Sequence, residues 1–154
     1  MNVHISRLVS GLLVLILAGQ LCTPAIALEP SGQPAASEDV VITQTFPDPK
    51  LQTWLLDKDN LGGAGEDGRL TLEERQSITE LNVSGLGLSS LEGLDTFFNL
   101  SVLNCSYNRL TTLDLSGNPK LTQLSCAYNQ LTKLDCSGLA QMIALNCEMN
   151  YLTD

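Results

Sequence analysis

Residues 100–120 read LSVLNCSYNRLTTLDLSGNPK, residues 121–141 read LTQLSCAYNQLTKLDCSGLAQ, and residues 142–154 begin a third copy, MIALNCEMNYLTD. When these copies are written in rows of 21 residues, apolar and amide residues fall into shared columns. The columns are Leu100/Leu121/Met142, Leu103/Leu124/Leu145, Cys105/Cys126/Cys147, Asn108/Asn129/Asn150 and Leu110/Leu131/Leu152. A looser copy starts near Glu80, one residue out of phase. Such a period predicts a solenoid, in which each copy forms one coil and packs on the next.

Each copy contains a short alternating segment that predicts a β-strand. Side chains alternate between the two faces of a strand, so Leu103 and Cys105 are expected to point inward and Asn104 outward. Strands one row apart would then lie about 4.8 Å apart in a parallel sheet. Where the chain leaves the strand, a column of asparagine amides is expected to satisfy buried backbone groups. This structural column consists of Asn108, Asn129 and Asn150.

The repeat unit resembles the leucine-rich repeat, whose signature is LxxLxLxxNxL. In residues 100–110 the signature is filled by Leu100, Leu103, Cys105, Asn108 and Leu110. The cysteine at the third apolar position, and a second LxxLxLxxN nested in residues 110–118, are similar to the short repeats of secreted bacterial leucine-rich proteins of the internalin type. The resemblance covers roughly residue 47 to the C-terminus. It implies an α/β fold, a leucine-rich-repeat solenoid with a short parallel β-sheet and an N-terminal helical cap.

The composition divides the chain into four segments. Residues 1–27 carry Arg7, an apolar run and small residues before an expected cleavage after Ala27, which is typical of a signal peptide. The run is too short for a stable membrane span, which needs about 20 apolar residues. Residues 28–45, rich in Pro, Ala, Ser and acidic residues, are expected to form a flexible leader. Residues 46–79 are predicted to form the helical cap, and residues 80–154 the repeats, in about three and a half coils with the last one truncated.

Two helix starts can be read in the cap segment. Asp48 followed by Pro49 is typical of an N-cap residue and the first helical position. Thr71 with Glu74 predicts a second short helix with an acidic first turn. Apolar residues of the first helix, among them Trp54, are expected to cover the open end of the first coil. Terminal coils of a solenoid need such a cover for solubility.

The loop between the two cap helices contains DGRLTLEE, residues 67–74, which resembles the second half of an EF-hand calcium loop. Gly63 and Gly65 stand where the first and third ligands of that loop belong. Two interpretations therefore remain, an inherited turn without metal or a weak Ca²⁺ site. The candidate metal ligands are Asp57, Asp59, Asp67 and Glu74. No other cofactor is predicted.

The cysteine column admits a metal, a redox or a packing role. The sequence has no CxxC motif, and its one histidine, His4, lies in the expected signal peptide. Strands in register would direct Cys105, Cys126 and Cys147 inward beside leucines, where cysteine packs as a small hydrophobic residue. We therefore expect structural, free and buried thiols that do no chemistry.

The outward strand columns form the candidate binding surface. Their side chains are small, polar and nearly uncharged, and two tyrosines lie one above the other at the strand ends. Tyrosine combines a rigid contact area with a hydroxyl group, which suits recognition. The alternative is that the tyrosines only shield the edge of the coil. The candidate ligand-binding residues are Asn104, Tyr107, Gln123, Ser125, Tyr128 and Asn146.

Charge and composition narrow the classes of function. With 8 Lys and Arg against 17 Asp and Glu, the 154-residue chain has a formal net charge of −9 and no basic patch, which argues against a nucleic-acid partner. It offers no catalytic triad or ligand cluster, so an enzyme is not expected. We expect a secreted or cell-surface recognition module, with the periplasm as an alternative location, that is adhesin-like and binds an extracellular protein or glycan.

Two further expectations concern the role and state of the chain. The competing interpretation of its role is a calcium-responsive structural cap, or a fragment of a longer surface protein without a binding role of its own. No polar cap follows the incomplete third copy in this sequence, which would leave the apolar end of its last coil open to water. We therefore expect self-association through this uncapped C-terminal coil.

Overall fold

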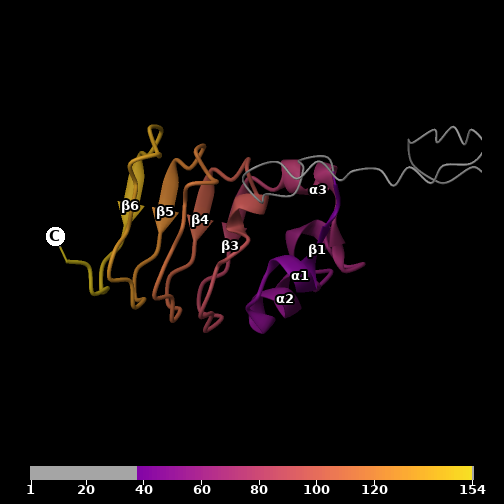
Figure 1. Ribbon diagram of the computed structural model, residues 1–154, viewed down its shortest axis with the longest axis horizontal. Helices are drawn as coiled ribbons and strands as arrows, with labels where there is room; N and C mark the ends of the chain where they lie inside the picture. Colours follow the sequence, from indigo (N-terminus) through magenta and orange to yellow (C-terminus); the bar gives the residue numbers. More distant parts are fainter. Residues whose placement is uncertain (1–37, 154) are drawn as a thin grey trace, which may run out of the picture. The chain divides into compact units, whose positions relative to one another are not determined.

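The computed structural model describes residues 38–153; the predicted signal peptide and most of the predicted leader lie outside them. These residues form three short α-helices, six short strands and two 3₁₀ turns (Figure 1). The helices are α1 (Ile42–Thr45), α2 (Pro49–Leu55) and α3 (Leu72–Ser77), and the turns are η1 (Leu61–Gly63) and η2 (Leu94–Thr96). The strands are β1 (Val40–Val41), β2 (Arg69–Leu70), β3 (Glu80–Asn82), β4 (Val102–Asn104), β5 (Gln123–Ser125) and β6 (Ala144–Asn146).

Strands β3, β4, β5 and β6 form one parallel sheet in chain order, as Figure 1 shows. Glu80 pairs with Val102, Val102 with Gln123, and Gln123 with Ala144. The predicted stacking of residues one row apart is therefore confirmed, and with it the α/β solenoid built on a short parallel sheet. Because one residue in each strand points inward, Leu81, Leu103 and Leu124 are buried in a core that runs from the cap through the coils.

The first coil is one residue longer than the next. Glu80 and Val102 are 22 residues apart, whereas Val102 and Gln123 are 21 apart. The extra residue lies between Leu88 and Leu94, because the backbone bonds on either side of this stretch match those of the following coil. Gly93 in this stretch has φ = 92°, and a Cβ there would lie 2.8 Å from the ring of Phe46. A glycine is thus required where the longer coil meets the cap.

The asparagine column bridges neighbouring coils, as predicted. The side-chain Nδ2 of Asn129 donates to the carbonyl oxygen of Cys105 in the preceding coil (2.9 Å) and to that of Cys126 in its own coil (3.0 Å). Its Oδ1 accepts the N–H of Leu110 (3.0 Å). Asn108 and Asn150 make the corresponding bonds one coil earlier and one coil later. Each asparagine therefore satisfies backbone groups that the turning chain would otherwise bury without partners.

Asp48 fastens the cap to the first coil. Its Oδ1 accepts the N–H of Lys50 (2.9 Å) and of Leu51 (3.4 Å) at the start of α2. Its Oδ2 accepts both the N–H (2.7 Å) and the hydroxyl (2.9 Å) of Ser89, a residue of the first coil. The predicted N-cap is thus confirmed, and the same buried carboxylate also joins two parts of the fold.

The second predicted helix start is also found, and the cap extends further towards the N-terminus than the sequence suggested. Thr71 and Glu74 form a reciprocal capping box at the start of α3. The predicted leader extends to residue 45, but the structure places its end in the cap, where Val40 pairs antiparallel with Leu70. Val40 and Ile42 belong to a short apolar run, and both side chains are buried in the hydrophobic core. The cap therefore begins near Val40.

Replacing Asn129 with alanine should lower the free energy of unfolding by about 3 kcal/mol, because buried backbone groups of two coils lose their partners. The matched change, Asn150→Ala, should have a smaller effect of about 1 kcal/mol, since Asn150 is half-buried and its partners reach water more easily. Urea unfolding followed by circular dichroism measures both. Equal losses of unfolding free energy in Asn129→Ala and Asn150→Ala would contradict the conclusion that burial determines how much each asparagine stabilises the fold.

Replacing Asp48 with asparagine should destabilise the chain at neutral pH and remove part of its acid sensitivity. Burial alone would raise the pKa of Asp48, but hydrogen bonds from Ser89, Lys50 and Leu51 outweigh it and hold the pKa below its ordinary value. A lowered folded pKa means that this carboxylate stabilises the fold above its unfolded pKa of about 3.9 and ceases to do so as the pH falls through the folded value. Thermal unfolding between pH 2 and pH 7, with the exposed Asp67→Asn as control, tests this; an unchanged pH profile in Asp48→Asn would refute it.

Candidate binding surface

The outward side chains of β3–β6 and of the residues directly after them make up one surface, called here the strand face. The strand pairing places its members in columns that run across the four coils. The columns are Glu80/Val102/Gln123/Ala144, Asn82/Asn104/Ser125/Asn146, Ser84/Ser106/Ala127/Glu148 and Gly85/Tyr107/Tyr128/Met149. Contrary to the sequence expectation, Ser106 and Ala127 are buried and contribute no exposed surface. All six ligand-binding candidates from the sequence therefore lie on one surface.

Short polar side chains of the strand face hold its own backbone in place. Asn104 Oδ1 accepts the N–H of Ser106 (3.2 Å), and Asn146 Oδ1 accepts the N–H of Glu148 (3.2 Å). The hydroxyls of Ser106 and Ser125 are 2.8 Å apart and hydrogen-bonded. The amide oxygens are thus used within the coil, while the side-chain amide nitrogens of these asparagines remain available to a partner.

Tyr107 and Tyr128 stack face to face at the strand ends. Their ring centroids are 4.5 Å apart and their planes differ by 9°. The rings are nevertheless largely in solvent, with 61% of Tyr107 and 44% of Tyr128 exposed. Both residues have left-handed backbones, with φ of 58° and 55°, which costs about 1–3 kcal/mol for a residue other than glycine. The fold therefore holds an exposed aromatic pair in a strained conformation.

The cysteine column is part of the core, as predicted for its structural role. Cys105 and Cys126 are buried and Cys147 is half-buried, and all three are free thiols. Burial, together with the neighbouring Cys126, raises the pKa of the Cys105 thiol. Burial raises the pKa of Cys126 to about 12, with a further contribution from Cys147 and Cys136. Cys105 and Cys126 are therefore thiols at neutral pH, and thiols are poor nucleophiles and poor metal ligands.

Three of the four candidate calcium ligands, Asp57, Asp67 and Glu74, accept hydrogen bonds within the cap itself. Glu74 Oε2 accepts the N–H (2.8 Å) and hydroxyl (2.9 Å) of Thr71 in the capping box. Asp57 accepts the N–H of Asp59 (3.0 Å), and Asp67 accepts the N–H of Arg69 (2.9 Å). Across residues 38–153, no three or more His, Cys, Asp or Glu side chains lie together in a way that could hold a metal ion. Asp57, Asp59, Asp67 and Glu74 are thus not gathered into one such group in the described part of the chain.

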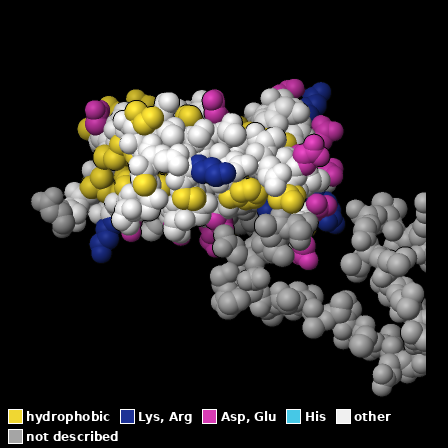
Figure 2. Space-filling view, turned by 90° about the horizontal axis from the view of Figure 1, so that it is seen from above, with side chains coloured by type: hydrophobic (Ala, Val, Ile, Leu, Met, Phe, Trp, Pro, Cys, Tyr) yellow, Lys and Arg dark blue, Asp and Glu magenta, His cyan; other side chains and the backbone are white. Residues whose placement is uncertain are grey.

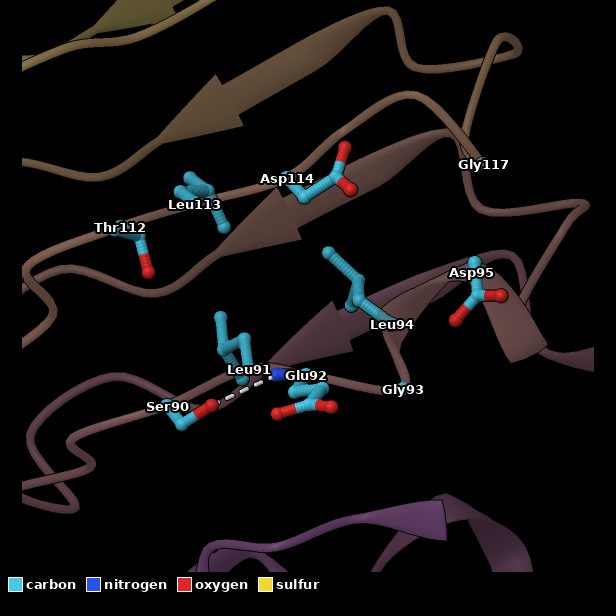
Figure 3. Close-up of a pocket in the computed structure, with 10 residues that line it drawn as sticks. All are labelled: Ser90, Leu91, Glu92, Gly93, Leu94, Asp95, Thr112, Leu113, Asp114 and Gly117. Carbon is cyan, nitrogen blue, oxygen red and sulfur yellow. Dashed lines mark hydrogen bonds between the residues drawn. The ribbon is translucent and has the colours of Figure 1, made fainter. Parts of the chain in front are cut away.

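A hollow of about 260 Å³ lies away from the strand face, between the loop before β4 and the loop after it (Figure 3). Its lining includes three carboxylates, Glu92, Asp95 and Asp114. Hydrogen bonds from Ser116 hold the pKa of Asp114 below its ordinary value, so this group is charged at neutral pH. The sequence does not predict this hollow. One sequence feature pointed towards the hollow. The copy near Glu80 is one residue out of phase with the later copies, because the first coil, which borders the hollow, has one extra residue.

Apolar side chains gather on the coil that contains β6, and Figure 2 shows hydrophobic groups at that end. Leu145 is 45% exposed, whereas Leu124, its counterpart one coil earlier, is 2% exposed. The difference arises because the described chain places a further coil over β5 and none over β6. The exposed apolar residues of this coil are Ile143, Leu145, Met149, Tyr151 and Leu152.

In the part of the chain that the structure describes, none of the helices has the length and apolar character required to cross a membrane.

Known proteins share both the repeat and the fold of this chain. Residues 98–141 match a family model described as leucine rich repeats (2 copies). The functional domain of InlJ from Listeria monocytogenes, described as including a cysteine ladder, is 29% identical with a TM-score of 0.68, and the match covers 78% of this chain and 26% of that one. The internalin inlF from Listeria monocytogenes str. 4b F2365 is 30% identical with a TM-score of 0.69, and the match covers 77% and 35% of the two chains. The chain thus spans about a quarter to a third of the length of these structures. A comparison with curated proteins gave no match.

Proposed function

This chain is an internalin-like leucine-rich-repeat protein, and we propose that it acts as a non-catalytic recognition module that binds an extracellular protein or glycan through its strand face. The observation that carries the proposal is the exposed stack of Tyr107 and Tyr128. A folded chain gains little stability from two rings left in solvent, and here their backbones are also strained. The left-handed backbone recurs at Gly85 and Met149, so it belongs to the turn of each coil, and it is the exposure of the two rings that supports a functional role.

The rest of the strand face has the chemistry of an adaptable binding surface. Around the tyrosines lie amide and hydroxyl groups, including Gln123 and Asn146, which are exposed. Tyrosine and asparagine are typical of surfaces that recognise partners by shape and hydrogen bonding rather than by charge. The sheet holds these groups in fixed columns, so little conformational entropy would be lost when a partner binds.

The expected location follows from the N-terminal signal sequence read in residues 1–27, which lies outside the described residues. Export would place the strand face outside the cytoplasm, in the adhesin-like role proposed from the sequence. The structural similarity to internalins supports this location. Solenoid repeats in general present extended surfaces for binding, which supports the strand face as the recognition surface.

We also infer that the open coil around β6 associates with a second copy of this chain. Two of its exposed apolar residues, Leu145 and Leu152, correspond to Leu124 and Leu131, which are buried in the preceding coil because the next coil covers them. Water contact with so many apolar groups is unfavourable, at about 25 cal/mol for each Å² of apolar surface. A second copy offers the same open edge and the same apolar side chains in return.

Replacing both tyrosines, as Tyr107→Ala/Tyr128→Ala, should abolish or strongly reduce capture of the partner, because the central contact area of the strand face is removed. Capture of extracellular proteins and glycans on the immobilised full chain measures this, with Tyr107→Phe/Tyr128→Phe as the matched variant that keeps both rings. Unchanged capture by the alanine variant would exclude the strand face from binding. Loss in both variants alike would place the effect on the hydroxyl groups instead.

The variant Ile143→Glu/Leu145→Glu should reduce self-association, because it introduces charge into the apolar surface of the last coil. Light scattering over a range of concentrations should show oligomers for the unmodified chain and a shift to monomer for the variant. Leu56→Glu, which alters an exposed apolar residue of the cap, serves as control and should leave the association unchanged. A monodisperse monomer of the unmodified chain at all concentrations would exclude this association.

A further inference from the structure

We propose that the free face of Tyr107, together with the empty position at Gly85, forms a slot that binds one pyranose ring of a glycan. This inference rests on the proposed function and specifies the ligand chemistry of one part of the strand face. It is carried by the register of the coils, by the exposure of the tyrosines and by the space at Gly85.

The backbone places Gly85 in the same column as the two tyrosines. The N–H of Gly85 donates to the carbonyl of Ser106 (3.0 Å), just as the N–H of Tyr107 donates to Ala127 (2.9 Å) and that of Tyr128 to Glu148 (2.9 Å). All these donors have left-handed backbones, with φ of 72° at Gly85. Gly85 is therefore the first-coil counterpart of the tyrosines, with no side chain in the position that a ring occupies in the next two coils.

The missing side chain leaves one face of the aromatic stack uncovered. Tyr107 has Tyr128 on one side and Gly85 on the other, whereas Tyr128 has Tyr107 and Met149 on its two sides. Tyr107 is accordingly the more exposed of the two, at 61% against 44%. A Cβ built at Gly85 would meet no atom within 4 Å, so the space beside the ring is open. A flat group one coil thick can lie there against the ring of Tyr107.

The rim of the slot is polar and uncharged on the strand side. The hydroxyl of Ser84 donates to Asn82 Oδ1 (2.8 Å), and both residues belong to the first coil directly before Gly85. Asn82 is exposed, and its amide nitrogen is available to a ligand oxygen. One aromatic face bordered by hydroxyl and amide groups matches a pyranose, which has an apolar C–H face and a rim of hydroxyls.

Two other kinds of ligand that can pack against an aromatic ring, an aromatic side chain and a cation, fit this slot less well. An aromatic side chain of a partner protein is bound strongly when it fills a closed, desolvated pocket, whereas this slot has a single apolar wall. A cation would meet positive charge, because Lys50 Nζ is bonded to the carbonyl of Gly87 (2.9 Å) two residues beyond Gly85. A neutral sugar avoids both difficulties, and the ammonium group is a further donor for its hydroxyls.

The test is an NMR titration of the full chain with methyl β-D-galactopyranoside, methyl β-D-glucopyranoside and methyl α-D-mannopyranoside. At least one of them should shift the Gly85 amide and the Tyr107 ring signals. Gly85→Tyr should remove this response by filling the slot, in a backbone conformation that two tyrosines of the same column already adopt. Tyr107→Ala should weaken binding by about tenfold or more, while Tyr107→Phe should retain it.

Controls separate the slot from the surface as a whole. Met149→Ala, at the opposite end of the stack, should leave sugar binding unchanged, and Gly85→Asn, which tolerates a left-handed backbone, replaces Gly85→Tyr if the latter unfolds. The proposal is overturned if no pyranoside shifts these signals, if Gly85→Tyr responds as the unmodified chain does, or if N-acetyltyrosinamide shifts them and the sugars do not. Partner capture that depends on the tyrosines but is unaffected by Gly85→Tyr and by the sugars would leave the proposed function standing without the slot.

Discussion

The fold depends on hydrogen bonds to the backbone N–H and C=O groups that the chain buries each time it turns from one coil to the next. In a helix or a wide sheet the backbone groups pair within the element, but strands of three residues leave many of them unpaired. Here the asparagine column supplies the missing partners, because each amide both donates and accepts across two coils. From coil to coil these bonds join equivalent backbone positions at 2.9–3.0 Å, although Val83 takes the place of a cysteine in the first coil.

This repeated bonding fixes the distance and register between coils, so the side chains on the surface are spaced with the same regularity. Two tyrosine rings can stack with parallel planes only because their backbones follow the same path. The same order makes an exception visible: Gly85 stands in the column of the tyrosines and leaves open space where the next two coils carry a ring. Differences along the strand face are therefore set by side chains at equivalent strand positions, while the paired strands keep the same register.

The sequence predicted those features that depend on local or periodic signals. The period of 21 residues fixed the strand columns, and the capping residues Asp48 and Thr71 located two helices, because each signal lies within a few residues or repeats at a fixed interval. Other features depend on contacts that are distant in sequence. The pairing of Val40 with Leu70, the bond from Asp48 to Ser89, and the acidic hollow beside the longer coil each need the folded chain to bring separate segments together.

The inward cysteines have a consequence for how the chain reaches its folded state. Their low reactivity belongs to the fold, because burial in the apolar core keeps the sulfur atoms protonated; in the extended chain the same groups would have ordinary acidity and full access to oxidants. An exported chain meets an oxidising milieu before it is fully folded. Coils that dock on their immediate neighbours can sequester each sulfur early, since such contacts form quickly. If the chain is exported as proposed, rapid coil-by-coil assembly would keep the four free cysteines of the described residues unlinked, whereas slow folding would allow them to cross-link.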